Sequence, residues 1–401
     1  MTLNKPIRPE DRATRLKVQQ TLKMARSAHA YVRGSTVQFY EWLKAQKSGT
    51  LPEGPPVWIC GDCHAGNLGP VAAVDGRVDI QIRDLDQTVI GNPAHDIIRL
   101  ALSLSTASRG SDLPGVTTAH ILEQVIEGYQ AALRRDVDQI EDPPQSVKAA
   151  MKQSTGRSWK HLARERLKNE KPTIPLGSKF WPLAADEKAD VKELFKTAAL
   201  RHLAVSLRSR DDDAEVDVLD AAYWMKGCSS LGLVRMAVLC GIGRGKKMEL
   251  ALMDVKEAVT AAAPRYPNEK MPKDNSERVV EGAVHLSPLL GKRMVAAKLG
   301  THSVFVRELL PQDLKLEIES LTIEEAMKSA NFLASVVGKA HGRQMDEPTR
   351  QKWADSLEQN RSKSLDAPTW LWSSVVTLIG RHEVAYLEHC RRYANEVRPT
   401  P

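Results

Sequence analysis

The stretch CGDCHAGNLG, which begins at Cys60, gathers residues that could support three different chemistries. Cys60, Cys63 and His64 have the C-x-x-C-H spacing of covalent haem attachment, and the two cysteines alone match a redox C-x-x-C motif. The polar residues Asp62, His64 and Asn67 instead follow the order of a phosphotransferase loop. In such a loop an aspartate faces the accepting hydroxyl and an asparagine holds a metal ion.

Both cysteine chemistries are disfavoured. Haem attachment of this kind occurs outside the cytosol, and the first twenty residues lack the apolar core and cleavage site of a secretory signal. A reactive C-x-x-C places its first thiol at a helix N-terminus, where the dipole lowers the thiol pKa. Here a strand pattern, Val57–Ile59, precedes Cys60, and Gly66 and Gly69 argue against a helix starting there. We therefore interpret the cysteines as small packing residues.

Length and composition indicate a cytoplasmic protein with a sizeable core. The 401 residues are 42% hydrophobic, which predicts two or three packed domains or one large bilobal domain. Five cysteines form a sparse, odd set typical of reduced thiols. No uncharged apolar run approaches the roughly 18 to 20 residues needed to cross a bilayer, so we expect no membrane partner.

The residues after the loop add oxygen-bearing side chains that could bind a metal ion. Val78–Ile82 alternates like a strand and leads into Arg83-Asp84-Leu85-Asp86. Asn67 and Asp84 could supply the few oxygen ligands that Mg²⁺ prefers beside phosphate. Asp96 then precedes a run with apolar residues at helical spacing, where the simplest role for it is a first-turn acid over a buried face.

These segments carry a family resemblance. The order GDCHAGN, RDLD and GNPAHDIIRLALSL resembles the aminoglycoside phosphotransferase and choline kinase branch of the protein-kinase-like superfamily. The whole chain resembles more closely the bacterial family called domain of unknown function 2252. The resemblance implies a catalytic base at Asp62, metal ligands at Asn67 and Asp84, and a buried brace of the loop at Asp96. His64 matches a loop-shaping position and joins Asp62 as a catalytic candidate, with a hydrogen-bonded core histidine as the alternative.

A nucleotide-binding segment is expected downstream of the loop. A glycine turn at 227–234 precedes a strand at 236–240, a second turn and a strand ending in Lys256. This is the order in which a phosphate-covering loop and a phosphate-pairing lysine occur. A helix opening near Ser276 would then carry an acidic partner for Lys256. The predicted nucleotide-binding residues are Gly227, Ser229, Ser230, Gly232, Lys256 and Glu281.

Each of these residues has a simpler alternative. Ser229 replaces the middle glycine of G-x-G-x-x-G, so an ordinary Gly/Ser turn between strands would also explain the segment. Lys256 could be a surface lysine paired with Glu257 or Asp254, and Glu277 competes with Glu281. If one Mg-nucleotide touches both groups, Lys256 lies within roughly 10 Å of Asp84.

The resemblance and the order of segments predict an α+β, bilobal protein-kinase-like fold with the lobes permuted in sequence. Residues 1–214 would form a mostly helical large lobe with the catalytic loop and metal site, and residues 215–312 a small antiparallel-sheet nucleotide lobe. Residues 313–401 would return to the large lobe as helices, at 322–341, around 370–379 and at 383–393. Chain ends usually lie at the surface, so such a permutation is physically allowed.

The predicted function is ATP-dependent, Mg²⁺-dependent phosphoryl transfer to an unidentified hydroxyl-bearing acceptor, a small molecule rather than a protein. Nucleotidyl (AMP) transfer on the same fold and a non-catalytic nucleotide- or nucleic-acid-binding module are the alternatives. The net charge of +7 and the basic stretch at 146–210 would suit an acidic partner such as nucleic acid. A solvated helix face explains that stretch more simply, and a substrate-capping insert is our functional hypothesis for it.

Overall fold

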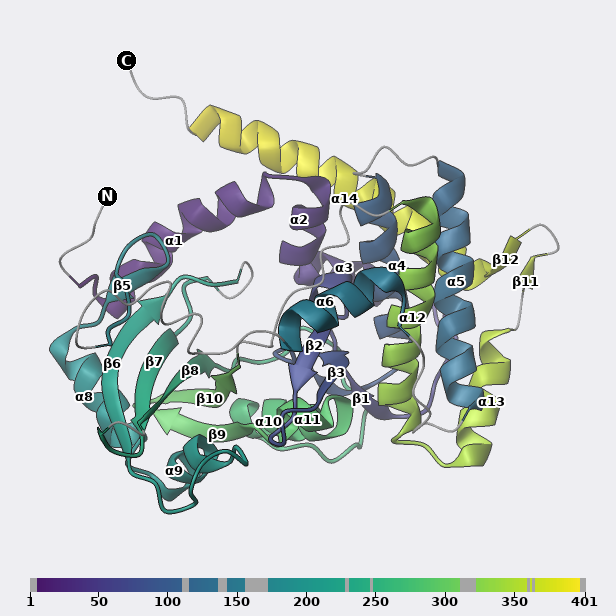
Figure 1. Cartoon of the computed structure of the whole chain (residues 1–401). Coiled ribbons are helices and arrows are strands. Elements are labelled where there is room, and N and C mark those ends of the chain that lie inside the picture. Colours follow the sequence, from purple (N-terminus) through teal and green to yellow (C-terminus); the bar gives the residue numbers. More distant parts are fainter. Residues whose placement is uncertain are drawn as a thin grey trace.

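A computed structural model describes residues 6–109, 115–135, 143–155, 172–227, 231–245, 248–310, 322–358, 361–362 and 365–396. The protein is an α+β protein with antiparallel sheets, in which a six-stranded sheet lies beside a group of long helices (Figure 1). Among the described helices, none is both long and apolar enough to cross a membrane.

The large sheet is antiparallel throughout, with the order β5-β6-β7-β8-β10-β9. β7 lies inside the sheet and every one of its residues is buried. The helix α10 separates β8 from β9 in the chain, and β10 then returns to pair with β8. The strands are β5 (Phe180–Pro182), β6 (Val216–Trp224), β7 (Arg235–Ile242), β8 (Glu249–Glu257), β9 (Met294–Leu299) and β10 (His302–Leu309).

The two faces of this sheet differ in chemistry because side chains alternate along each strand. Met253 and Val255 of β8 point into an apolar cluster that α8 (Ala185–Leu194), α9 (Ala198–Val205) and α1 (Pro9–Met24) complete. Asp254 and Lys256 belong to the opposite face, together with charged residues from β7 and β10. β5, which precedes residue 215, is therefore a strand of this sheet, and α8 and α9, which also precede residue 215, pack against the sheet.

The long helices enclose a second, larger core. α4 (Ala94–Arg109), α5 (Gly115–Arg134) and α12 (Ile323–Gly342) pack side by side, with α13 (Glu347–Leu357) against α5 (Figure 1). α14 is one helix, Thr369–Glu396, so the two helices expected around 370–379 and 383–393 are continuous. The smaller elements around this core are α2 (Ala28–Gly34), α3 (Thr36–Lys44) and the antiparallel pairs β1 (Val57–Ile59) with β4 (Val89–Gly91), β2 (Leu68–Ala72) with β3 (Val78–Ile82), and β11 (Arg361–Ser362) with β12 (Leu365–Pro368).

α10 (Asn275–Leu286) links the sheet to the larger core. The Asp274 side chain caps its N-terminus by accepting from the backbone N–H groups of Ser276 and Glu277. Its apolar face, which includes Val279, Ala283 and Leu286, belongs to the core of the long helices rather than to the core under the sheet. A short helix, α11 (Pro288–Gly291), then leads into β9.

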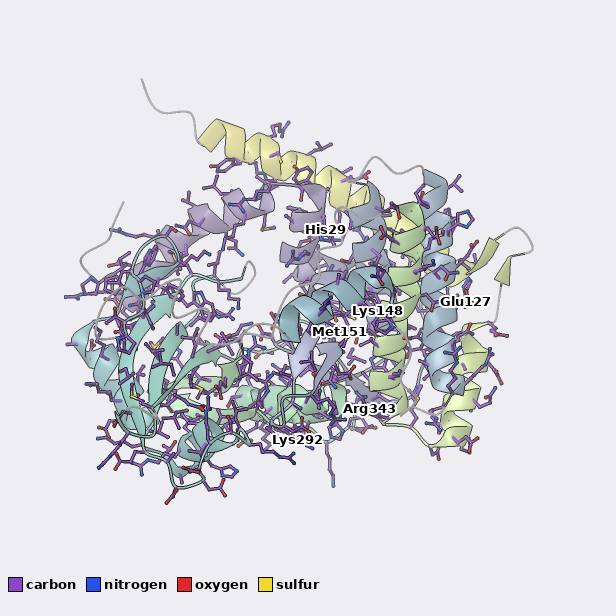
Figure 2. The ribbon with its side chains drawn as sticks, viewed as in Figure 1. His29, Glu127, Lys148, Met151, Lys292 and Arg343 are labelled. Carbon is purple, nitrogen blue, oxygen red and sulfur yellow. The ribbon has the colours of Figure 1, made fainter. Side chains whose placement is uncertain are left out.

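The described part of the basic stretch begins with α6 (Gln145–Thr155). Lys148 and Met151 lie on this helix, and Met151 packs against the larger core (Figure 2). α6 contacts α12, β2 and β3. Residues 156–171, which hold six of the lysines and arginines of this stretch, fall outside the described residues.

Candidate functional site

One face of α4 holds the loop that follows β1. Asp96, Arg99 and Ser103 lie at positions i, i+3 and i+7 of α4, and they share one face because α-helical side chains repeat every 3.6 residues. The Asp96 carboxylate accepts from Cys60 N at 2.7 Å and from Gly61 N at 3.0 Å. Ser103 Oγ accepts from Ala65 N at 3.3 Å. The loop is therefore fixed to this buried helix by Asp96 at its start and by Ser103 further along.

Gly61 allows the sharp turn at the start of this loop. Its φ is +75°, and a Cβ at this position would lie 2.2 Å from the backbone oxygen of Gln87. Only glycine fits both the conformation and the space. The Tyr40 hydroxyl donates to the Gly61 carbonyl, so the turn is held from α3 as well as from α4.

Asp62 is directed into the site by an ion pair with Arg99. Arg99 Nη2 donates to Asp62 Oδ1 at 2.5 Å, and Nε donates to the same oxygen at 3.2 Å. The Arg99 side chain is fully buried, whereas 14% of the Asp62 side chain is exposed. Arg99 also donates to Val32 O and Thr36 Oγ1. A buried arginine thus fixes the predicted catalytic base at its edge of the pocket.

His64 and Asn67 complete the loop, which ends in the 3₁₀ turn Ala65–Asn67. Asn67 Nδ2 donates to Asp62 O at 3.0 Å, which leaves the amide oxygen for other partners. Burial lowers the pKa of His64 to about 3, so the ring is neutral near pH 7. Among the described residues, buried His64 Nδ1 has no hydrogen-bond partner, so the satisfied core histidine considered above does not describe it.

Lys256 and Asp84 meet although they lie 172 positions apart in the chain. Lys256 Nζ is 3.1 Å from Asp84 Oδ1 and also contacts Asp86 Oδ2. The Lys256 side chain is 3% exposed and the Asp84 side chain 42%. The expected separation of roughly 10 Å or less between Lys256 and Asp84 agrees with this geometry.

The two carboxylates titrate in opposite directions. Burial opposes ionisation of Asp84, but the positive charges of Lys256, Arg307 and Arg235 outweigh it and hold the pKa of Asp84 well below its usual range. Burial and the negative charge of Asp84 raise the pKa of Asp86. Asp86 Oδ1 is buried and has no hydrogen-bond partner among the described residues.

A second charged cluster lies on the same sheet face. Arg235 of β7 donates to both oxygens of the buried Asp254, at 2.9 and 2.6 Å, and Arg307 of β10 approaches Asp254 at 3.4 Å. Arg307 also donates to Arg83 O at 2.6 Å, next to Asp84. Asp254 therefore pairs with arginines, so it is not the surface partner of Lys256 considered as an alternative.

Asp62, His64, Asn67 and Asp84 open into one pocket of about 490 Å³. Five basic residues also line this pocket: Lys23, Arg26, Arg33, Lys179 and Lys226. A larger hollow of about 750 Å³ lies between α3 and α14, but its lining contains no carboxylate. The smaller pocket is therefore the candidate functional site.

The glycine segment reaches the pocket at one end. Gly227 lines the pocket, and its carbonyl accepts from Lys23 Nζ of α1 at 3.0 Å. Gly232 has a φ of +102° and a Cβ there would lie 3.3 Å from Ala13 Cα, so this glycine faces α1. Ser229 and Ser230 lie outside the described residues.

Glu281 is not where we expected it. It lies on the exposed face of α10, as does Glu277, while the partners of Lys256 in the described chain are Asp84 and Asp86. The buried face of α10 carries Arg278 instead, three positions before Glu281. The expected ion pair fails because the helix buries its 278–279–282–283–286 face, which places residue 281 on the solvent side.

Arg278 is the charged side chain that α10 turns inward. Its guanidinium donates to Asp86 O at 3.1 Å, to Val259 O at 2.8 Å and to Thr88 O. Gly282, one turn later, allows the close approach, because a Cβ there would lie 2.4 Å from the Thr88 side chain. α10 therefore braces the turn after Asp84 through backbone oxygens.

The cysteines behave as packing residues. Cys60 is fully buried, Cys63 is 1% exposed, and both are free thiols within the larger core. A hydrogen bond with Cys63 and burial raise the pKa of the Cys60 thiol well above its usual value. A protonated, buried thiol is unreactive, as a packing role requires.

A buried chain of hydrogen bonds supports the loop from behind. Trp353 Nε1 donates to Tyr129 Oη at 3.1 Å, and Tyr129 Oη lies 2.8 Å from His341 Nδ1. His341 Nε2 lies 3.2 Å from Asp96 Oδ2 on the other side of the ring. The C-terminal helices α12 and α13 thereby orient the carboxylate that holds Cys60 and Gly61.

The sequence analysis did not predict several residues of the site, although a sequence pattern marks some of them. Arg99 and Ser103 follow Asp96 at helical spacing within an apolar run, which marks a polar face directed at a buried partner. Arg235 and Arg307 are charged residues in buried strands, but their pairing with Asp254 requires strand register that the sequence does not state.

The fold and the site define an α+β protein whose charged pocket lies between a helix-braced loop and one face of an antiparallel sheet. The chain belongs to the family DUF2252, described as an uncharacterized protein conserved in bacteria, whose family model matches residues 12–392. No curated protein and no solved structure matches the chain.

Proposed function

We propose that the protein is an ATP- and Mg²⁺-dependent phosphotransferase that acts on a hydroxyl group of a small molecule. The contact between Lys256 and Asp84 carries this proposal, because it joins a strand lysine to an aspartate beside the Asp62 loop. In protein kinases the phosphate-pairing lysine lies on the third strand of its sheet, ahead of a helix, and the metal-binding aspartate faces it. Lys256 likewise ends the meander β6-β7-β8 and precedes α10.

The residues around Asp84 fit a nucleotide-borne magnesium ion. Within the described residues, no three or more His, Cys, Asp or Glu side chains are grouped so that they could hold a metal ion by themselves. Mg²⁺ usually takes one or two carboxylates and completes its shell with phosphate and water. Asp84, Asn67 and Asp86 Oδ1, which has no hydrogen-bond partner in the described part of the chain, provide oxygens of that kind. When bound, the ion would neutralise charge on the phosphates.

The chain's own groups have definite tasks in such a transfer. The acceptor oxygen attacks the γ-phosphorus, the bond from that phosphorus to the bridging β-phosphate oxygen breaks, and ADP leaves. Asp62 orients the acceptor hydroxyl and receives its proton. Arg99 holds Asp62 in place, and Lys256 pairs with phosphate oxygens after it separates from Asp84.

Nucleotidyl transfer is the second candidate. Arg235 and Arg307 place positive charge on the sheet side of Asp84, and the basic pocket residues place it on the other side. A phosphate chain could therefore run in either direction from Asp84, with either the γ- or the α-phosphorus near Asp62. Incubation with γ-labelled or α-labelled ATP separates the two reactions by which label reaches the acceptor.

Thermal unfolding in the presence and absence of Mg²⁺ tests the proposed binding of ATP. ATP at a hundred times its Kd stabilises a fold by about 2.7 kcal/mol, and we expect this only with Mg²⁺ present. Lys256→Met should abolish the shift, whereas Lys298→Met, which replaces an exposed side chain of β9, should keep it. No shift at millimolar Mg-ATP, or an equal shift in a chelator, would refute the proposal. A metal-dependent shift without any label transfer would identify a binding module.

A further inference from the structure

The basic lining of the pocket exceeds what its visible carboxylates can neutralise. Arg99 is paired with Asp62, Lys256 with Asp84 and Asp86, and Arg235 with Asp254. In contrast, no carboxylate among the described residues pairs with Arg26, Arg33 or Lys179. These three cations surround the same opening as Asp62 and Asp84.

Arg33 lies on the acceptor side of the pocket. Its guanidinium crosses the Asp62 loop at Gly66, where a Cβ would lie 3.1 Å from the guanidinium carbon and 3.2 Å from His64 Cε1. Its Nε is buried without a hydrogen-bond partner among the described residues. Arg26 lies in the turn between α1 and α2, and Arg33 lies on α2. Both arginines line the same pocket as Asp62.

Lys226 adds a further basic side chain to the pocket lining. It lines the pocket with its ammonium group 4.3 Å from the centre of the Trp224 ring. Burial lowers its pKa to about 7, Asp254 opposes the shift, and Arg235, Arg307 and Arg83 add to it. Such a lysine is stabilised in its charged form when an anion enters.

We propose that the acceptor is a small anion, which carries a phosphate or carboxylate group held by Arg26 and Arg33 while its hydroxyl faces Asp62. This inference rests on the proposed function. Planar guanidinium groups bind such anions through paired N–H donors, which also fixes orientation. A neutral acceptor would leave these arginines unneutralised in a pocket of about 490 Å³.

Glycerol and glycerol 3-phosphate form a matched pair of probes, because they share hydroxyl groups and differ by one phosphate. Calorimetric titration is performed on the full chain saturated with Mg²⁺ and the non-hydrolysable analogue β,γ-imido-ATP, which fills the donor phosphate positions. We expect glycerol 3-phosphate to bind at millimolar concentration and glycerol not to bind. Arg33→Gln and Arg26→Gln should each weaken the binding about tenfold or more.

Arg201→Gln is the matched control, because Arg201 is an exposed arginine on α9 and does not line the pocket. Arg26 is exposed, so its replacement leaves the fold intact even if Arg33→Gln is unstable. Equal responses to the two probes, no binding of either, or displacement of the nucleotide by glycerol 3-phosphate would each overturn the inference. If the nucleotide analogue does not bind, the proposed function fails, and titration of the nucleotide-free protein still decides the anion site.

Discussion

Replacing Asp62 by alanine should weaken the fold as well as the proposed transfer reaction. Arg99 is fully buried and its charge is compensated by Asp62, which it contacts at 2.5 Å. Removing one partner of a buried ion pair leaves an uncompensated charge and costs about 3–5 kcal/mol. Arg99 keeps its bonds to Val32 O and Thr36 Oγ1, which favours the lower end of that range. We therefore expect Asp62→Ala to lower the unfolding free energy by about 3 kcal/mol.

Asp62→Asn separates stability from chemistry. An asparagine keeps an oxygen at the position that accepts from Arg99, so the expected loss is about 1–2 kcal/mol. The amide cannot take a proton from an acceptor, and loss of a general base lowers turnover by a factor of about 10² to 10⁴. Mg-ATP affinity should remain near the wild-type value, because Asp62 acts on the acceptor and mainly in the transition state.

Urea denaturation of four proteins measures the coupling: wild type, Asp62→Ala, Arg99→Met and the double variant. Because the two side chains share one buried contact, the double variant should lose about 2 kcal/mol less than the sum of the single losses. Additive losses would show that Arg99 does not depend on Asp62. Reduced Mg-ATP affinity with unchanged turnover would refute the role assigned to Asp62.

Three further predictions concern the loop. Gly61→Ala should lower the unfolding free energy by about 3 kcal/mol, because a Cβ would lie 2.2 Å from a backbone oxygen at a φ of +75°; a loss below about 1 kcal/mol in urea would contradict the backbone account. Cys60→Ala and Cys63→Ala should each leave transfer activity within about tenfold, as mild core changes do; covalently bound haem or activity that follows thiol oxidation would contradict the packing role. His64 is neutral in the fold with its pKa lowered to about 3, so its stabilisation is present above pH 6.5 and is lost as the pH falls toward 3. The unfolding free energy should drop by about 2 kcal/mol more between pH 7 and pH 5 in the wild type than in His64→Gln, and parallel pH profiles would exclude this account.

Sequence pattern predicted those parts of the structure that depend on local periodicity. The strand Val57–Ile59, the turn after it and the strand that carries Lys256 all lie where alternation and glycine placed them. The helix after Asp96 follows equally from apolar residues at 3.6-residue spacing. A sequence states such features directly, because each depends on neighbours within one or two turns.

Features that depend on the rotation of a helix about its axis or on the register of paired strands could not be predicted from the sequence. Glu281 was expected to face Lys256, but α10 turns Arg278 inward because its apolar stripe binds the core of the long helices. That stripe could equally have packed under the sheet, and tertiary contacts of α10 with β9, β10, β1 and α12 decide its orientation. The same holds for Arg235 and Arg307, whose common partner Asp254 is set by the pairing of β7, β8 and β10.

The geometry of the loop depends on segments at both ends of the chain. The Asp96 carboxylate accepts from Cys60 N and Gly61 N, and the Oδ2 that accepts from Cys60 N also lies 3.2 Å from His341 Nε2 of α12. His341 is held in turn by Tyr129, which accepts from Trp353. Lys256 reaches Asp84 only when the sheet is docked beside this loop. The contacts of Tyr129 with His341, of Lys256 with Asp84 and of His341 with Asp96 each join residues that are more than 100 positions apart in the chain. The contacts between the loop and α4 are closer in sequence. Loop closure over such separations costs entropy, and buried charged hydrogen bonds offset part of that cost only if all partners are in place. The pocket therefore forms as a unit with the folding of the whole chain, rather than within any one of its three sequence segments.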